Sequence, residues 1–122
     1  MVDLVDEVKA ILMNDDTISV LAPGGVHWVR PPGEGPYLKA FLVVAESGNS
    51  PQDFADDREI ESLINIQIEV YSPGKFGALK EAVNNAMVAA GYTRESVGVD
   101  GYIPEFKLYT KPMAFSIEKG VV

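Results

Sequence analysis

Two stretches of the chain place apolar residues at the three- and four-residue spacing of an amphipathic helix. In the first, residues 3–14, Asp3 can cap the helix, and Asp6 and Glu7 lie in its first turns, where negative charge suits the helix dipole. The apolar side of this stretch comprises Leu4, Val5, Val8, Ile11 and Leu12. We therefore predict an N-terminal helix that ends at Asn14-Asp15-Asp16.

The second helical stretch follows Ser72-Pro73-Gly74. Serine at the N-cap and proline at the first helical position are typical of a helix start, and Gly91 suits the left-handed residue that follows a helix end. The apolar stripe of this stretch comprises Phe76, Leu79, Val83, Ala86, Met87 and Ala90. The pattern thus predicts a helix between Ser72 and Gly91.

Residues 17–22, TISVLA, fit either a helical turn capped by Asp16 or a short strand. The three-residue spacing of Ile18 and Leu21 favours the turn, and Pro23-Gly24-Gly25 ends the segment.

Runs rich in β-branched and aromatic residues predict five strands. The clearest period of two runs through residues 60–71, where isoleucine and valine alternate with Asn65, Gln67 and Glu69. Asp100-Gly101 predicts a turn, and Pro112 predicts an edge position, a bulge or a break in the last strand. The predicted strands are 26–30, 37–46, 60–71, 92–99 and 106–118.

The polar segment between the second and third strands has no such period. Residues 46–61 contain six acids and one base, a net charge of −5, with few residues available for burial. Because such a segment cannot offset the entropy cost of ordering, we predict a long, mobile acidic loop at about 46–59 that becomes ordered only in an assembly. The alternative is a solvated connector that has no partner.

The order of elements is helix, three strands, helix, two strands (α-β-β-β-α-β-β). Strands joined by short turns favour an α+β fold, a mainly antiparallel β-sheet with two α-helices on one face. We predict one domain over residues 1–122, with a core that includes Leu12, Val43, Ile64, Ile66, Ile68, Leu79, Val83 and Met87.

Composition removes several classes of function. The chain has 122 residues, is 47% apolar and 23% charged, and contains no cysteine, which excludes a disulfide framework, a thiolate zinc site and a cysteine nucleophile. The chain has no long apolar run and its N-terminus is acidic, so neither a membrane span nor a signal peptide is expected. A net charge of −8 argues against a sequence-reading nucleic-acid binder.

The candidate chemistry is sparse. His27 is the single histidine, it has no GxSxG elbow beside it, and a structural role is expected for it. The glycine-rich pieces at 23–25 and 33–35 match no phosphate-binding motif, and Lys75 near a helix start reads as a surface lysine. Asp53, Asp56 and Asp57 lack the spacing of a calcium loop. We therefore expect no catalytic residue, no cofactor and no metal site.

The sequence offers better candidates for a protein interaction surface than for an active site. Trp28 and Arg30 are of the types enriched at interface hot spots, although Trp28 could instead lie in the core. In the acidic segment, Phe54 could anchor a contact and Arg58 could pair with an acid of a neighbouring subunit. The candidate interaction residues are Trp28, Arg30, Asp53, Phe54, Asp56, Asp57 and Arg58.

The chain resembles the small tail-completion or tail-terminator proteins of bacteriophages, also called tail-to-head joining or minor tail proteins. The features that carry the resemblance are an amphipathic helix leading into NDDTISVLAPGGVHWVRPP, then YLKAFLVV, a long polar segment, INIQIEVYSP and FGALKEAVNNAMVAAGY, and a terminal strand pair. The resemblance covers nearly the whole chain as an order of elements and includes no catalytic motif.

The resemblance implies a structural protein of the virion, present in the host bacterial cytoplasm during assembly. Such proteins form rings, often hexameric, at the head-proximal end of the tail tube, where they end tube growth and join tail to head. The implied partners are further copies of the chain, which is monomeric when free, the tail tube protein and the head-closure or connector protein. DNA passes through the lumen without sequence-specific binding, and acidic walls would let it slide.

Two alternatives remain open at this stage. The chain could be another phage neck or tail component, such as a head-closure or tube protein. It could also be a small-ligand-binding or enzymatic α+β domain that uses His27 and residues of the acidic segment.

Overall fold

The computed structural model describes residues 4–28, 37, 39–55 and 58–120, with the backbone alone for residues 4, 47–55, 58–63 and 119–120. Within these residues the chain forms three helices and six strands. In chain order they are α1 (Leu4–Met13), α2 (Asp16–Leu21), β1 (Val26–Trp28), β2 (Phe41–Ala55), β3 (Arg58–Ser72), α3 (Gly77–Ala89), β4 (Thr93–Val97), β5 (Gly101–Ile103) and β6 (Leu108–Gly120).

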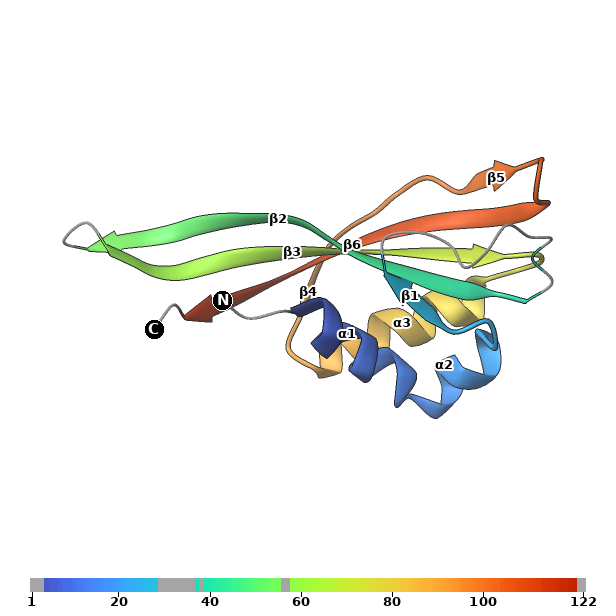
Figure 1. Cartoon of the computed structure of the whole chain (residues 1–122), viewed down its shortest axis with the longest axis horizontal. Coiled ribbons are helices and arrows are strands. Elements are labelled where there is room, and N and C mark those ends of the chain that lie inside the picture. The colour runs from blue at the N-terminus through green and yellow to red at the C-terminus, as the bar shows by residue number, and fades with distance from the viewer. Residues whose placement is uncertain (1–3, 29–36, 38, 56–57, 121–122) are drawn as a thin grey trace.

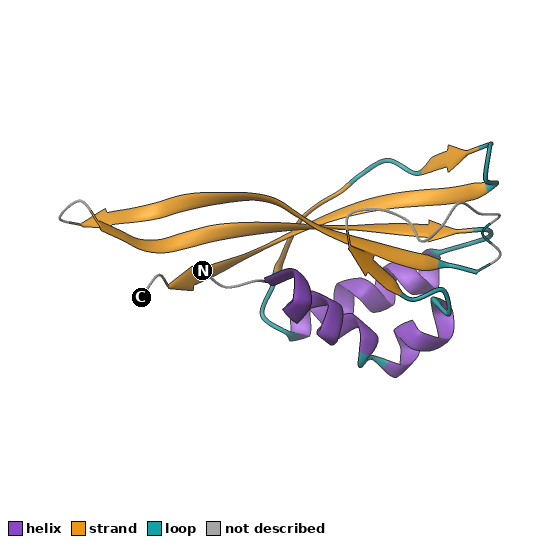
Figure 2. Ribbon diagram, in the orientation of Figure 1, coloured by secondary structure: helices purple, strands orange, loops and turns teal. Residues whose placement is uncertain are grey.

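The strands form one mixed sheet in the order β1-β2-β3-β6-β4, and β5 also pairs with β6. Every pair is antiparallel except β1 with β2. All three helices lie on one face of this sheet (Figures 1 and 2). The α+β class and the helices on one face are confirmed, while the predicted order of elements lacks α2 and β5.

The main core lies between the helices and the sheet. Leu12, Val83 and Met87 of the helices pack against isoleucines 64, 66 and 68 of β3, all of them buried. Val43 is also buried, but it points to the opposite face of the sheet, where it packs with Phe41 and Leu108. The predicted core residues are therefore all buried, in two clusters rather than one.

The segment left open between turn and strand is the helix α2. Its N-cap is Asp15, whose carboxylate oxygen Oδ1 accepts a hydrogen bond from the backbone N–H of Ile18 at 3.0 Å. Ile18 is buried in the main core, which fixes the helix against α3. The helical alternative was correct, with the cap one residue earlier than Asp16.

The start of the second predicted helix is wrong. Ser72 is the last residue of β3, and its Oγ accepts a hydrogen bond from the backbone N–H of Gly74 at 3.2 Å, which makes a turn. The helix α3 begins only at Gly77, and Phe76 stands at its N-cap without a side-chain hydrogen bond. At the other end Gly91 has φ +97°, the left-handed conformation that the sequence predicts there.

Pro112 lies inside β6, opposite Glu69 of β3. Its carbonyl accepts a hydrogen bond from the N–H of Gly98 at 2.8 Å, so the proline nitrogen faces the same side, away from β3. On that side β4 pairing ends at Met113 and β5 pairing begins at Thr110. Proline therefore occupies the break between two short partner strands and costs no hydrogen bond with β3.

The predicted turn at Asp100-Gly101 is also wrong, because Gly101 begins β5 and the reversal lies between Ile103 and Leu108. None of the helices in the described ranges is long and apolar enough to cross a membrane.

Candidate interaction surface

The acidic segment predicted as a loop is largely a β-hairpin. β2 continues to Ala55 and pairs with β3, from Glu46 opposite Ile66 to Ala55 opposite Arg58. The register shifts at Glu46/Gly48, Pro51/Asp53 and Asp53/Phe54, so the hairpin is irregular where the period of two fails. The prediction of a loop at 46–59 is corrected, and the mobility expected for this segment stays a prediction.

We name residues 46–55 of β2 and 58–66 of β3 the arm. In Figure 1 the outer part of the arm extends far beyond the helices, at the left of the view. β6 continues beside it and pairs with β3 as far as Glu61 opposite Gly120. On its other side, β2 pairs with β1 only from Leu42 to Val44, so within the described residues no strand covers the outer edge of the arm.

Three predicted interaction residues lie at the far end of the arm. In the backbone register, Asp53 is opposite Glu61, Phe54 opposite Glu59, and Arg58 opposite Ala55. The hairpin therefore brings Asp53, Phe54 and Arg58 together. Asp56 and Asp57 lie outside the described residues.

Trp28 lies elsewhere, at the base of the arm. It is the last residue of β1, opposite Val44, and its side chain is 62% exposed, so the alternative that placed it in the core is wrong. Ten residues of β2 separate Val44 from Phe54, about 33 Å along an extended strand. Trp28 and the far end of the arm are thus two separate surfaces, and Arg30 lies outside the described residues.

The opposite end of the sheet has the opposite charge. Here β2 begins, β3 ends, and β5 turns into β6, as the pairs Phe41 with Tyr71 and Ile103 with Leu108 show. The described charged residues of this end are four lysines and three acids, a net charge of +1. They are Lys39, Lys75, Lys107, Lys111, Glu69, Asp100 and Glu105.

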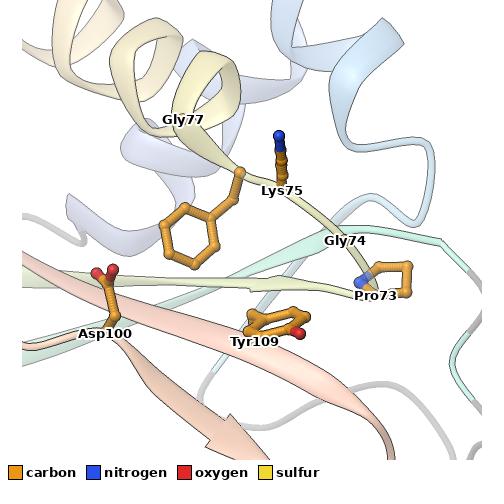
Figure 3. A pocket seen from close by; sticks show the side chains of 7 residues that line it. Pro73, Gly74, Lys75, Gly77, Asp100 and Tyr109 are labelled. Atoms are coloured by element: carbon orange, nitrogen blue, oxygen red, sulfur yellow. The ribbon is translucent and has the colours of Figure 1, made fainter.

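A cleft of about 600 Å³ opens at this basic end, between the β3–α3 connection and the strands β5 and β6 (Figure 3). Pro73, Lys75 and Phe76 line one side, and Asp100 and Tyr109 line the other. The carboxylate of Asp100 forms an ion pair with the ammonium of Lys111 at 2.6 Å. Figure 3 shows the side chain of Lys75 directed away from Tyr109, at the rim of the cleft.

Exposed aromatic side chains extend the cleft surface. Tyr109 is 46% exposed and Tyr102 is 51% exposed, and their ring centroids lie 4.8 Å apart. The prediction from the sequence missed both tyrosines. The alternation of side chains along β6 does place Tyr109 on the side opposite to Leu108 and Thr110. This alternation does not show whether the side that carries Tyr109 is packed in a core or open to a cleft.

His27 has a local structural role. Its Nε2–H donates a hydrogen bond to the carbonyl of Gly24 at 2.8 Å, which assigns the proton to Nε2. The ring meets the edge of Phe41 with centroids 6.0 Å apart. Both contacts hold the tight turn that leads from α2 into β1, as the sequence leads us to expect for this histidine.

The sheet face opposite the helices carries a second aromatic cluster. Phe41 stacks on Tyr71 with centroids 4.8 Å apart, and the tilted ring of Tyr37 contacts Phe41 with centroids 5.2 Å apart. Burial, together with the charge of Glu69, raises the pKa of the Tyr71 hydroxyl to about 12. Since these rings pack on one another, the cluster stabilises the sheet rather than offering an open binding site.

A further hollow, beside β4, carries two glutamates. Glu95 and Glu118 line one hollow of about 390 Å³ beside β4, but Glu95 accepts a hydrogen bond from the Ser116 hydroxyl, and the hollow contains no histidine. Within the residues that the structure describes, no group of three or more histidines, aspartates and glutamates could hold a metal ion.

Comparison with known proteins finds this fold in a solved structure. No protein-family model matches the chain, and no curated protein matches it. Among solved structures, the chain is similar to a chain described as "Virion of native gene transfer agent (GTA) particle", with a TM-score of 0.66 and 17% sequence identity. The match covers 93% of this chain and 92% of the other, so the two share one fold over almost their whole length.

Proposed function

We propose that this chain is a structural protein of a phage-type virion. In this role it forms a ring at the head-proximal end of the tail tube, ends tube growth and joins tail to head. The observation that carries the proposal is the shared fold with a chain of a gene transfer agent virion, which extends over 93% of this chain. The order of elements that resembles phage tail-completion proteins supports the same class.

The length and the outer edge of the arm support a role in assembly. A long hairpin whose outer edge no described strand covers presents backbone N–H and C=O groups that another chain can pair with. A protein that worked alone would gain nothing from such an edge and would risk aggregation. A subunit of a ring uses such an extension to reach a neighbour.

The charge of the chain suits a lumen that DNA passes through. With a net charge of −8, the walls of a ring repel the phosphate backbone, and DNA slides without adhering. The partners in this proposal are further copies of the chain, the tail tube protein and the head-closure or connector protein. The location is the virion, with assembly in the host bacterial cytoplasm.

Electron microscopy of the purified protein mixed with tail tubes tests the proposal. We expect rings on one end of each tube and no further growth when tube protein is added. Tubes that continue to grow with bare ends would contradict the assignment to the head-proximal end. Rings that bind only isolated heads would favour a head-closure protein, the other neck component considered above.

A further inference from the structure

We propose that the far end of the arm of one copy of this chain docks in the basic cleft of a second copy. This inference deepens the proposed ring and rests on it, since it names the contact between neighbouring subunits. The two surfaces lie at opposite ends of the same molecule, so the contact repeats from copy to copy.

The first argument for this contact is the charge complementarity between the arm and the cleft. The arm contains four acids and one base, a net charge of −3, and the two aspartates of the sequence between its strands bring residues 46–66 to −5. The described residues at the cleft end carry a net charge of +1. Lys75 and Lys107 are exposed and form no ion pair with the described residues, whereas Asp100 is already neutralised by Lys111. An acidic segment that enters the cleft therefore meets free ammonium groups and no uncompensated carboxylate on its floor.

The second argument for this contact is the apolar lining of the cleft. Pro73, Phe76 and Tyr109 offer ring and apolar surface inside the cleft, and Tyr102 extends it. A purely anionic ligand would leave this surface unused. The far end of the arm combines its acids with one aromatic residue, Phe54, so it has both the charge and the apolar anchor that the cleft accepts.

The geometry favours a second copy as the occupant. Contact between two arms would bring a charge of −3 against another −3, which like-charge repulsion opposes. Contact between arm and cleft is heterologous, because it joins different surfaces of identical chains. Such contacts close into a ring when the rotation between copies allows it, as the proposed function requires.

Engineered cysteines test the contact directly, because the chain has none of its own. Ala55→Cys lies at the end of β2, and Gly74→Cys lies at the cleft, where an added Cβ meets nothing within 4 Å. Under mild oxidation, we expect a mixture of the two single variants to give a crosslinked dimer of one copy of each. The double variant should give a ladder of multimers.

Each single variant alone provides the control. Abundant dimers of Ala55→Cys alone would indicate contact between arms and would overturn the proposal. The absence of mixed dimers, on tube ends or in concentrated protein, would also overturn it.

Charge reversal gives a second, independent readout. We expect Lys75→Glu to weaken self-association about tenfold in sedimentation velocity, and Asp53→Lys in the same chain to restore it. Lys9→Glu makes the same charge change on α1, away from the cleft, and should leave association within about twofold. Equal weakening by Lys9→Glu would mean that net charge alone matters.

The outcome separates this inference from the proposed function. Ring-capped tubes without arm-to-cleft crosslinks would remove the inference and leave the function intact. Arm-to-cleft multimers that never bind tubes would remove the function and keep the contact. Crosslinking of the cleft cysteine to tube protein instead of to a second copy would identify a different occupant and contradict the proposal.

Discussion

Ile66 and Phe115 lie opposite each other on β3 and β6, and neither side chain is exposed to solvent. Both side chains belong to the main core, which lies between this face of the sheet and the helices. Ile66→Asp would place an unpaired carboxylate there, so we expect the free energy of unfolding to fall by about 3–5 kcal/mol. Urea denaturation followed by circular dichroism measures this loss.

The adjacent residue is the matched control. Gln67 is exposed on the other face of the same strand, so Gln67→Asp should change the free energy of unfolding by less than about 0.5 kcal/mol. An unchanged denaturation midpoint for Ile66→Asp would show that the register of β3 is wrong.

Two glycines predict opposite effects of one substitution. A Cβ on Gly24 would lie 2.7 Å from the carbonyl oxygen of Ala40, a backbone atom that cannot move aside without shifting β2. We expect Gly24→Ala to destabilise the protein by about 1–3 kcal/mol in thermal unfolding. Gly77→Ala, at the open start of α3, should be neutral or should stabilise by up to about 1 kcal/mol. The reverse order of melting temperatures would contradict the packing described for this turn.

His27→Ala removes a hydrogen bond and a ring contact without touching the arm or the cleft. We expect a loss of about 1 kcal/mol in stability and no loss of tail joining, as judged by infectivity of particles that carry the variant. Loss of infectivity with normal folding and normal particle assembly would instead indicate chemistry at His27.

Tyr92 predicts a stability change at alkaline pH. Burial, with the charge of Glu7 nearby, raises the pKa of its hydroxyl to about 12, against about 10 in the unfolded chain. The folded state holds this proton more tightly, so the stabilisation is complete below pH 10 and is lost as the pH rises from about 10 to 12. Tyr92→Phe should therefore flatten the decline in unfolding free energy over that window.

At neutral pH the same variant should keep or slightly raise stability, because the hydroxyl is buried and has no hydrogen-bond partner among the described residues. Tyr71→Phe removes another hydroxyl with a raised pKa and should flatten the same window. Parallel pH curves for the natural protein and Tyr92→Phe would contradict the proposed environment of this tyrosine.

A shortened arm separates folding from assembly. Asn49 and Ile64 lie opposite each other, so residues 50–63 can be replaced by Asn-Gly, a two-residue hairpin turn. Because the main core remains, we expect the variant to unfold cooperatively, as the natural protein should, and to fail to join tails to heads. Normal joining by this variant would show that the outer arm has no part in assembly.

The regular parts of the fold were predictable from local pattern. The alternation through residues 60–71 identified β3, and the stripe from Leu79 to Met87 identified α3, because each pattern matches the period of its element. The N-terminus of α3 was not predictable in this way. Ser72 is a good cap locally, but its place opposite Tyr109 in the sheet prevails over that preference.

The sequence pattern did not predict the arm or the cleft, for two different physical reasons. Residues 47–55 have no period of two, and β2 forms there because β3 provides a partner strand in register. The cleft gathers Lys75, Asp100 and Tyr109 from three separate segments, and only the sheet topology brings them together. Charge was the signal visible in advance, and the contact role that it suggests for residues 46–61 stays a prediction.

The most direct measurement of the central claim is cryo-electron microscopy of tail tubes assembled in the presence of this protein. The proposed function predicts one ring of this chain on the head-proximal end of every tube, with DNA-free lumens continuous through the ring. Tubes of uncontrolled length with no density for this chain at either end, from protein that is folded, would contradict the claim.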